Sequence, residues 1–252
     1  MSIRLLSVLI LTFIFVTSAQ LQEDLRFDFS YEINRIYPAI SVSETRLNQV
    51  ETIVDLNRYF KDAWVREYHS VEISGFINGT LHKVFGKGFE LTKDQKNFLH
   101  ELDNVTPVEV KITYTPENTL KNNPPKEYNF SITIDPDQQA SFPGGVLALD
   151  KYLTEHIIDK ISLEHFTINQ LTAVTFTITK NGEIDNVEVF ESSNDPDIDK
   201  VLVETLCKMP LWQPATYTNG LTVDQKFALT LGDMRSCIVN LLNIRPRKVE
   251  EN

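Results

Sequence analysis

The side chains that most often carry out chemistry are scattered along this 252-residue chain. The closest two of its five histidines are nine positions apart, whereas two metal ligands on one helix face need a spacing of three or four. No serine lies in the G-x-S-x-G pattern of a nucleophile elbow. We therefore expect a protein that is not an enzyme and that needs no metal or cofactor. The histidines are His69, His82, His100, His156 and His165.

Two further clusters have the residue types of ligand sites but lack the rest of the pattern. Asp195, Asp197 and Asp199 alternate as in a calcium loop, yet a proline separates the first two and no Gly or closing Glu follows at EF-hand spacing. Their expected role is favourable charge at a helix N-terminus. The pair Gly144-Gly145 follows no apolar strand, so it is expected to let the chain enter a helix and not to bind phosphate.

The composition excludes several classes of partner. The chain has 24 basic and 35 acidic residues, a net charge of −11, and no block of like charge. This balance argues against nucleic acid or an anionic lipid surface as the main partner. Two cysteines, Cys207 and Cys237, are too few for a disulfide framework and match no zinc-binding spacing. The 42% of hydrophobic residues is enough for one large domain or two small ones.

The first nineteen residues have the pattern of a secretory signal peptide. Arg4 precedes an apolar run over 5–16, which the small residues Thr17, Ser18 and Ala19 follow. Because crossing a bilayer takes about 20 apolar residues, this shorter run favours cleavage after Ala19 over an uncleaved membrane anchor. We expect the mature protein to be exported and periplasmic.

The second half of the chain alternates between helical and strand-like hydrophobic patterns. Asn181-Gly182 separates two strand-like segments and is the dipeptide best suited to a type I′ turn, so a hairpin is expected there. Pro210 cannot continue a helix and should end the second one. The expected order is a helix at 146–158, strands at 173–180 and 187–190, a helix after Asp195-Pro196 and a strand at 223–231.

The first half can be laid on the same pattern. When the two halves of the sequence are aligned, the apolar residues between 53 and 64 match those of the first helix of the second half. Asn78-Gly79 matches Asn181-Gly182. The segment 94–107 aligns with the second helix of the second half and with the proline that ends it. The alternative is that the two halves align by chance, since any two α+β segments share hydrophobic periodicity. The repeated Asn-Gly dipeptide and the repeated proline argue against chance. In the first half, Phe130, Ile132 and Ile134 align with Phe227, Leu229 and Leu231 of the last strand.

These patterns predict an α+β protein of two tandem small domains, each with two helices packed on an antiparallel sheet. The link is expected at 135–141, where Asp, Pro and Gln interrupt the apolar pattern. The predicted division is a signal peptide at 1–19, a first domain at 20–136 and a second domain at 137–252.

Four stretches of the second domain together resemble a known family. They are Phe142-Pro143-Gly144-Gly145, the turn at Asn181-Gly182, the segment 187–193, and Met209-Pro210-Leu211-Trp212-Gln213-Pro214-Ala215. This set resembles the TonB C-terminal domain, in the form found in periplasmic proteins of Bacteroidetes. The similarity covers about residues 140–235, and Met-Pro-x-Trp-x-Pro after a helix is its most specific part. The first domain would then be a divergent repeat of the same unit.

The resemblance implies a binding module and no catalyst. In the family, the domain captures a short extended segment of an outer-membrane transporter and passes on work drawn from the proton gradient. Capture is by β-augmentation, in which an exposed sheet edge pairs with an incoming strand. Carried over by position, that edge is the strand with Val223, Gln225, Phe227, Leu229 and Leu231.

Several departures put the details of capture and of coupling to a motor in question. No Tyr-Pro pair follows the first helix, and Ala173 stands near a position where the family commonly has Gly. The chain also lacks a Pro-rich spacer that could cross the periplasm. The alternative function is a structural or assembly protein, whose sheet edges pair with each other or in a homodimer.

Two structural expectations concern the end of the second helix. Trp212, held between Pro210 and Pro214, is expected to be buried against that helix. Cys207 and Cys237 form a candidate disulfide, because an exported protein meets an oxidising compartment. Two buried thiols that never meet are the open alternative.

Overall fold

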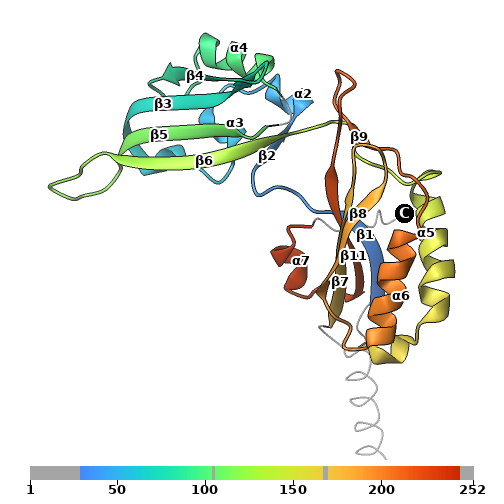
Figure 1. The fold of residues 1–252 in the computed structure, drawn as a ribbon. Coiled ribbons are helices and arrows are strands. Elements are labelled where there is room, and N and C mark those ends of the chain that lie inside the picture. Colours follow the sequence, from blue (N-terminus) through green and yellow to red (C-terminus); the bar gives the residue numbers. More distant parts are fainter. Residues whose placement is uncertain (1–28, 104–105, 167–169, 245–252) are drawn as a thin grey trace, which may run out of the picture.

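The computed structural model describes residues 29–103, 106–166 and 170–244 (Figure 1). The signal peptide predicted at 1–19 lies outside these ranges. Across them, no helix combines the length and the apolar character that crossing a membrane would require.

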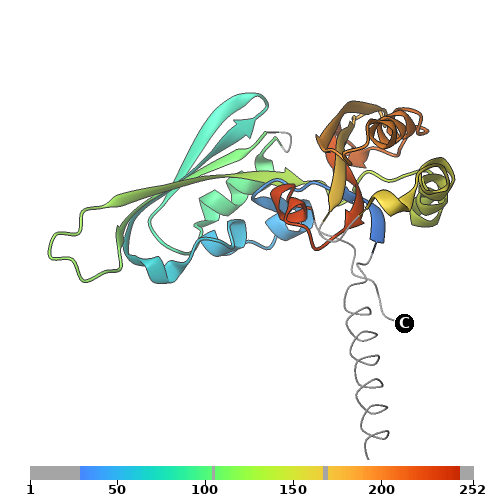
Figure 2. The ribbon, with the colours of Figure 1, turned by 90° about the horizontal axis from the view of Figure 1, so that it is seen from below.

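The chain is of mixed α and β structure and forms two main sheets in two adjoining bodies (Figures 1 and 2). The five-stranded sheet has the order β2-β6-β5-β3-β4, and the four-stranded sheet has the order β1-β11-β7-β8. All neighbours are antiparallel except β2 with β6, and β9 with β10 forms a separate ribbon. The strands are β1 (Phe29–Arg35), β2 (Ser41–Ser43), β3 (Val65–Ile77), β4 (Thr80–Gly86), β5 (Val108–Pro116), β6 (Lys126–Asp135), β7 (Leu171–Ile178), β8 (Ile184–Glu191), β9 (Ala215–Thr216), β10 (Thr222–Val223) and β11 (Gln225–Asp233).

Helices cover both faces of the four-stranded sheet, with α5 and α6 on one face and α7 on the other (Figure 1). Leu153 of α5 and Leu202 of α6 share a core with Leu229 of β11, whereas Val239 of α7 packs with Ala228. The five-stranded sheet has a separate core. The helices are α2 (Glu44–Leu47), α3 (Ile53–Leu56), α4 (Lys93–Glu101), α5 (Gly145–His156), α6 (Pro196–Cys207) and α7 (Ile238–Leu241), with 3-10 turns η1 (Asp62–Trp64), η2 (Ile158–Lys160) and η3 (Leu163–His165).

The aspartates before and within the first turn of α6 stabilise the start of this helix, as predicted. Asp195 accepts hydrogen bonds from the backbone N–H groups of Asp197 and Ile198, at 2.9 and 3.4 Å. Asp199 accepts from the Ser192 hydroxyl at 2.6 Å and from the Ser193 N–H at 2.9 Å. Burial would raise the pKa of Asp199, but these hydrogen bonds outweigh it, so the pKa lies below its usual value.

The two Asn-Gly dipeptides make different turns. Asn78 and Gly79 both have positive φ, 50° and 73°, and close a two-residue hairpin between β3 and β4. At the second dipeptide only Gly182 has positive φ, 83°. The Gly182 N–H donates to Thr179 O at 2.8 Å, which gives a three-residue loop with the glycine in its last position. The hairpin of β7 and β8 is confirmed, but its predicted type I′ turn is wrong.

The predicted helix over the apolar residues 53–64 is wrong. Helix α3 ends at Leu56, because Asn57 leaves helical geometry with φ −142° and ψ 96° and is itself buried. Trp64 lies in the short turn η1 and is exposed. The apolar spacing in this segment instead places Ile53, Leu56 and Phe60 in the core of the five-stranded sheet.

Both sheets contain the same order of strand, strand, helix and strand, but the matching last strand is not the predicted one. In the first sheet β5 follows α4 and pairs with β3, as β11 follows α6 and pairs with β7. The predicted match of β6 with β11 is therefore wrong, and β5 was absent from the expected order. The alternation of Val108, Val110 and Ile112, all buried, was the available signal for β5.

The sheets are not made from two contiguous halves of the chain. Strand β1, assigned to a first domain at 20–136, pairs instead with β11 in the sheet of the second half. The chain then crosses to the other body through β2 and returns after β6, which ends at Asp135.

The expectations for Trp212 and for the cysteines have opposite outcomes. Trp212 is buried, with 5% of its surface exposed, as predicted. The disulfide prediction is wrong, because Cys207 and Cys237 are free and both are exposed. Cys207 ends α6 and Cys237 directly precedes α7, and these helices pack on opposite faces of the sheet (Figure 1).

Candidate functional site: free sheet edges and the junction of the two sheets

The strand predicted to be an open edge is an interior strand of its sheet. β11 pairs with β7 on one side and with β1 on the other, in seven registered pairs from Phe29↔Asp233 to Arg35↔Phe227. Val223 lies outside it, in β10. Gln225, Phe227, Leu229 and Leu231 are all buried. The prediction that these residues present a free edge is therefore wrong.

Strand β1 is held on β11 by side chains as well as by the ladder. Ile33 is buried in the core beneath α5 and α6, and the ring of Phe29 packs edge-on against Phe166 at 5.2 Å. The Tyr31 hydroxyl lies 3.0 Å from that of Thr154 on α5. The sequence signal for β1 was available, since Phe29, Tyr31 and Ile33 alternate with polar residues.

The edge at β8 has features that oppose strand addition. Its pairing with β7 contains two register shifts, and Asn186 within it has φ 50°. It also carries Asp185, Glu188 and Glu191 and no basic residue. Bulges and charges on an edge strand are the usual means by which proteins prevent unwanted pairing.

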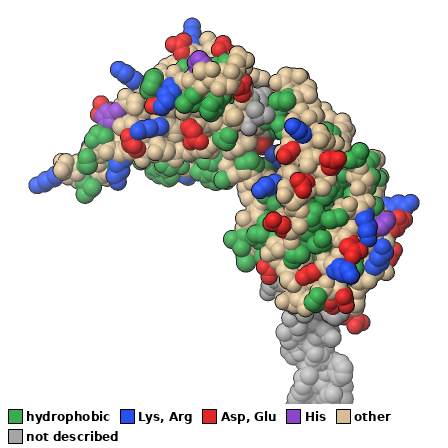
Figure 3. All heavy atoms as spheres, in the orientation of Figure 1, with side chains coloured by type: hydrophobic (Ala, Val, Ile, Leu, Met, Phe, Trp, Pro, Cys, Tyr) green, Lys and Arg blue, Asp and Glu red, His purple; other side chains and the backbone are tan. Residues whose placement is uncertain are grey.

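The edge at β4 is regular and apolar. Its seven pairs with β3 run without a shift, from Val71↔Gly86 to Ile77↔Thr80. Leu81 and Phe85 point to the outer face with 53% and 62% of their surfaces exposed, and the partly exposed Phe76 lies opposite Leu81. The surface of this body carries hydrophobic, basic, acidic and histidine side chains side by side (Figure 3).

The unpaired N–H groups of β4 can be assigned from its register. Ile77↔Thr80 closes a two-residue turn and is a hydrogen-bonded pair, after which the pair types alternate. Leu81, Lys83 and Phe85 therefore belong to non-hydrogen-bonded pairs, and their N–H groups point away from β3. Residues 80–88 contain Lys83 and Lys87 and no carboxylate. Lys83 forms an ion pair with Glu72 of β3 at 2.6 Å, so Lys87 carries the one basic charge of 80–88 that has no ion pair among the described residues.

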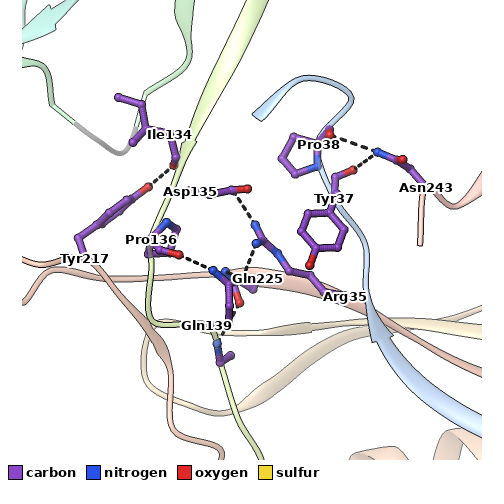
Figure 4. Close-up of polar contacts among 11 residues, drawn as sticks. Arg35, Tyr37, Pro38, Ile134, Asp135, Pro136, Gln139, Tyr217, Gln225 and Asn243 are labelled. Atoms are coloured by element: carbon purple, nitrogen blue, oxygen red, sulfur yellow. Dashed lines mark hydrogen bonds and ion pairs between the residues drawn. The ribbon is translucent and has the colours of Figure 1, made fainter. Parts of the chain in front are cut away.

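A network of polar contacts joins the two bodies (Figure 4). Arg35 at the end of β1 forms an ion pair with Asp135 at the end of β6, at 2.6 Å. The Tyr217 hydroxyl donates to Ile134 O at 2.8 Å, and burial raises the pKa of Tyr217 to about 12. Glu44 of α2 accepts hydrogen bonds from the N–H and hydroxyl of Thr218. Each contact joins a residue of one body to a residue of the other.

The remaining motif residues have structural roles. Gly144 and Gly145 have φ 83° and 77° and turn the chain into α5, after Pro143. Trp212 packs on the rings of Phe142 and Phe227, at 5.6 and 5.5 Å, and shares a core with Leu202 and Leu206 of α6. Pro210 and Pro214 flank it outside any helix.

Neither metal ligation nor similarity to known proteins adds a further assignment. Within 29–103, 106–166 and 170–244, no three His, Cys, Asp or Glu side chains lie close enough together to hold a metal ion. The chain matches no protein-family model, no curated protein and no solved structure. The sheet edges and the junction are the features from which a function can be argued.

Proposed function

We propose that this protein is an exported, non-catalytic binding protein of the cell envelope that pairs with an extended segment of an outer-membrane transporter at the edge of β4. The observation that carries the proposal is the regular free edge of β4, with exposed Leu81 and Phe85 beside its outward N–H groups. Backbone pairing would supply affinity, and the apolar side chains would select the incoming residues.

Two further features support this proposal. The resemblance of residues 140–235 to the TonB C-terminal domain favours a transporter segment as the partner. The resemblance points to β11 as the capturing strand, but β1 already covers that edge within the same chain. Capture at β4 needs no rearrangement. Lys87, which directly follows β4 and has no ion pair among the described residues, favours a segment that carries an acidic residue.

The test is a pair of variants at one position. Lys83→Pro removes an outward N–H without removing a bond to β3, and Lys83→Thr removes the same charge but keeps the N–H. Wild type and both variants are used to capture proteins from solubilised envelope. The captured proteins are identified by mass spectrometry, and peptides of their periplasmic segments are then titrated. Melting temperatures check that both variants are folded.

The expected result is that wild type and Lys83→Thr retain an outer-membrane transporter and bind its peptide, while Lys83→Pro binds neither. Equal binding by both variants would show that β4 is not the edge used. If wild type retains no envelope protein, the binding function is rejected.

A second candidate function is assembly of the chain with itself through an edge strand, and the edge strands are β1 and β8 of one sheet and β2 and β4 of the other. The regular, apolar edge of β4 favours this function, because it can pair with the same strand of a second copy, whereas the bulges and charges of β8 oppose pairing. Sedimentation at rising protein concentration tests this. Oligomers that form in wild type and Lys83→Thr but not in Lys83→Pro would support assembly, whereas a monomer at all concentrations would exclude it.

A further inference from the structure

We infer that the cavity at the junction of the two sheets binds a small oxyanion, a free ligand that carries carboxylate or phosphate groups. The cavity has a volume of about 330 Å³ and lies between the end of β1, the connection to β2 and the helices α2 and α3. This volume is at the lower end of the range for small-molecule sites. The site is separate from the β4 edge, so the inference does not depend on the proposed function.

Positive charge is concentrated in this cavity. Arg35, Arg46 and Arg58 all line it, and they are three of the five arginines in the part of the chain that the structure describes. No lysine contributes. In a protein with a net charge of −11, such a cluster is unlike the rest of the surface.

The two carboxylates of the lining are already engaged. Asp55 accepts hydrogen bonds from the N–H groups of Glu51 and Thr52, at 3.1 and 2.9 Å, and from the Thr52 hydroxyl at 2.8 Å. Asp135 is paired with Arg35. These acids fix the start of α3 and the end of β6. Burial raises the pKa of Asp55, but its hydrogen bonds and the charge of Arg46 bring it below its usual value, so Asp55 offsets part of the charge of Arg46.

Arg46 and Arg58 are free to contact a ligand. Neither forms an ion pair with any residue in 29–103, 106–166 or 170–244. The guanidinium of Arg58 lies over the ring of Tyr59, 5.2 Å from its centre, and donates to the Tyr59 hydroxyl at 3.1 Å. This stacking restricts the side chain at the mouth of the cavity.

Arg35 lines the same cavity and supplies a fixed, largely buried cation. Its side chain is 11% exposed, lies over the ring of Tyr37 at 4.6 Å and donates to Gln139 (Figure 4). Its Nε is buried and has no acceptor among the described residues. Because this Nε has almost no accessible surface, Arg35 contributes its positive charge to the cavity and not a hydrogen bond from this atom.

This arrangement suits an oxyanion better than other ligands. A guanidinium offers a planar pair of donors that matches carboxylate or phosphate oxygens. Arg35 belongs to the four-stranded sheet, whereas Arg46 and Arg58 belong to the other body. A ligand that contacts all three would therefore fasten the two bodies together.

The test uses inorganic phosphate and citrate as probes, each titrated by calorimetry into the mature full-length protein at constant ionic strength. The variants are Arg46→Gln and Arg58→Gln, and the matched control is Arg66→Gln, an exposed arginine of β3 outside the cavity. Sodium chloride at the same ionic strength controls for screening. Circular dichroism without ligand checks that all three variants are folded.

We expect one saturable site for at least one of the probes, a higher melting temperature in its presence, and affinity about tenfold weaker in each cavity variant, or about 1.4 kcal/mol. Arg66→Gln should bind as wild type does. Phosphate alone would indicate a phosphate ligand, and citrate alone a polycarboxylate. The inference is overturned if neither probe binds, or if Arg66→Gln weakens binding as much as the cavity variants do.

Discussion

Trp212 occupies the centre of the larger core of the four-stranded sheet. Its ring contacts those of Phe142, Phe176 and Phe227, each at a tilted or edge-on angle. The backbone is fixed there as well, because the Trp212 N–H donates to Gly182 O at 2.8 Å. A Cβ on Gly182 would lie 2.1 Å from Trp212 O, so this glycine is required by the close approach of the loop.

Replacing this ring should be costly. We expect Trp212→Ala to lower the free energy of unfolding by about 3–5 kcal/mol, because it leaves a cavity among three aromatic rings. The neighbouring Leu211 is exposed, so Leu211→Ala should change stability by no more than about 0.5 kcal/mol. Denaturant unfolding measures both. Equal effects of the two substitutions would contradict the structural role of Trp212.

Asp199 should make the stability of the protein depend on pH. Its pKa is lower in the folded chain than its ordinary value of 3.8, because the hydrogen bonds from Ser192 and Ser193 outweigh burial. A lowered pKa stabilises the fold above the unfolded pKa, and this stabilisation is lost as the pH falls through the folded value. Asp199→Asn should therefore be less stable than wild type at pH 7, with a smaller difference below about pH 4. A difference that does not change between these pH values would contradict the assignment.

Residues of the second half were predicted better than those of the first. Trp212 between two prolines and Asp195 before Pro196 depend on local chain geometry, which the sequence specifies directly. Asn181 does not adopt the predicted positive φ, because the loop has three residues in place of the two of a type I′ turn, and Gly182 in its last position lies against Trp212 O. That contact joins residues 30 positions apart, so no local pattern could reveal it.

At the scale of secondary-structure elements, β1 determines what β11 can bind. Ile33 is the buried apolar residue of β1, and the seven pairs of β1 occupy the edge of β11 from Phe227 to Asp233. An extended partner could use β11 only after β1 had left it.

We expect Ile33→Asp to release β1, because the substitution places an unpaired charge in the core. Hydrogen exchange should then become faster in 29–35 and in 225–233. Ile33→Val should retain protection, at a cost of about 0.5–1.5 kcal/mol. If the amides of β11 stay protected in Ile33→Asp while those of β1 exchange, another segment covers that edge.

The edges could not be predicted from periodicity alone. Alternation identifies a strand, as at β5 and β1, but does not say which strand lies beside it. The pairing of β1 with β11 joins residues about 200 positions apart, and an edge is defined by such pairing. The prediction that the residues of β11 form a strand was therefore correct, and the prediction that this strand is a sheet edge was wrong.

At the scale of the whole molecule, the two bodies are joined by buried polar contacts. Arg35 and Asp135 have side chains only 11% and 9% exposed, and each comes from a different sheet. Removing one partner of a buried ion pair leaves an uncompensated charge, whereas replacing both by apolar residues costs much less.

We therefore expect Asp135→Ala to lower the free energy of unfolding by about 3–5 kcal/mol. The double substitution Arg35→Met with Asp135→Leu should recover most of that loss. The chain has one tryptophan in each body, Trp64 and Trp212, so Trp64→Phe leaves Trp212 fluorescence as a probe of the four-stranded sheet. In that background Asp135→Ala should shift the Trp212 transition, although Asp135 lies on the other sheet. An unchanged Trp212 transition would mean that the bodies unfold independently and that the ion pair does not couple them.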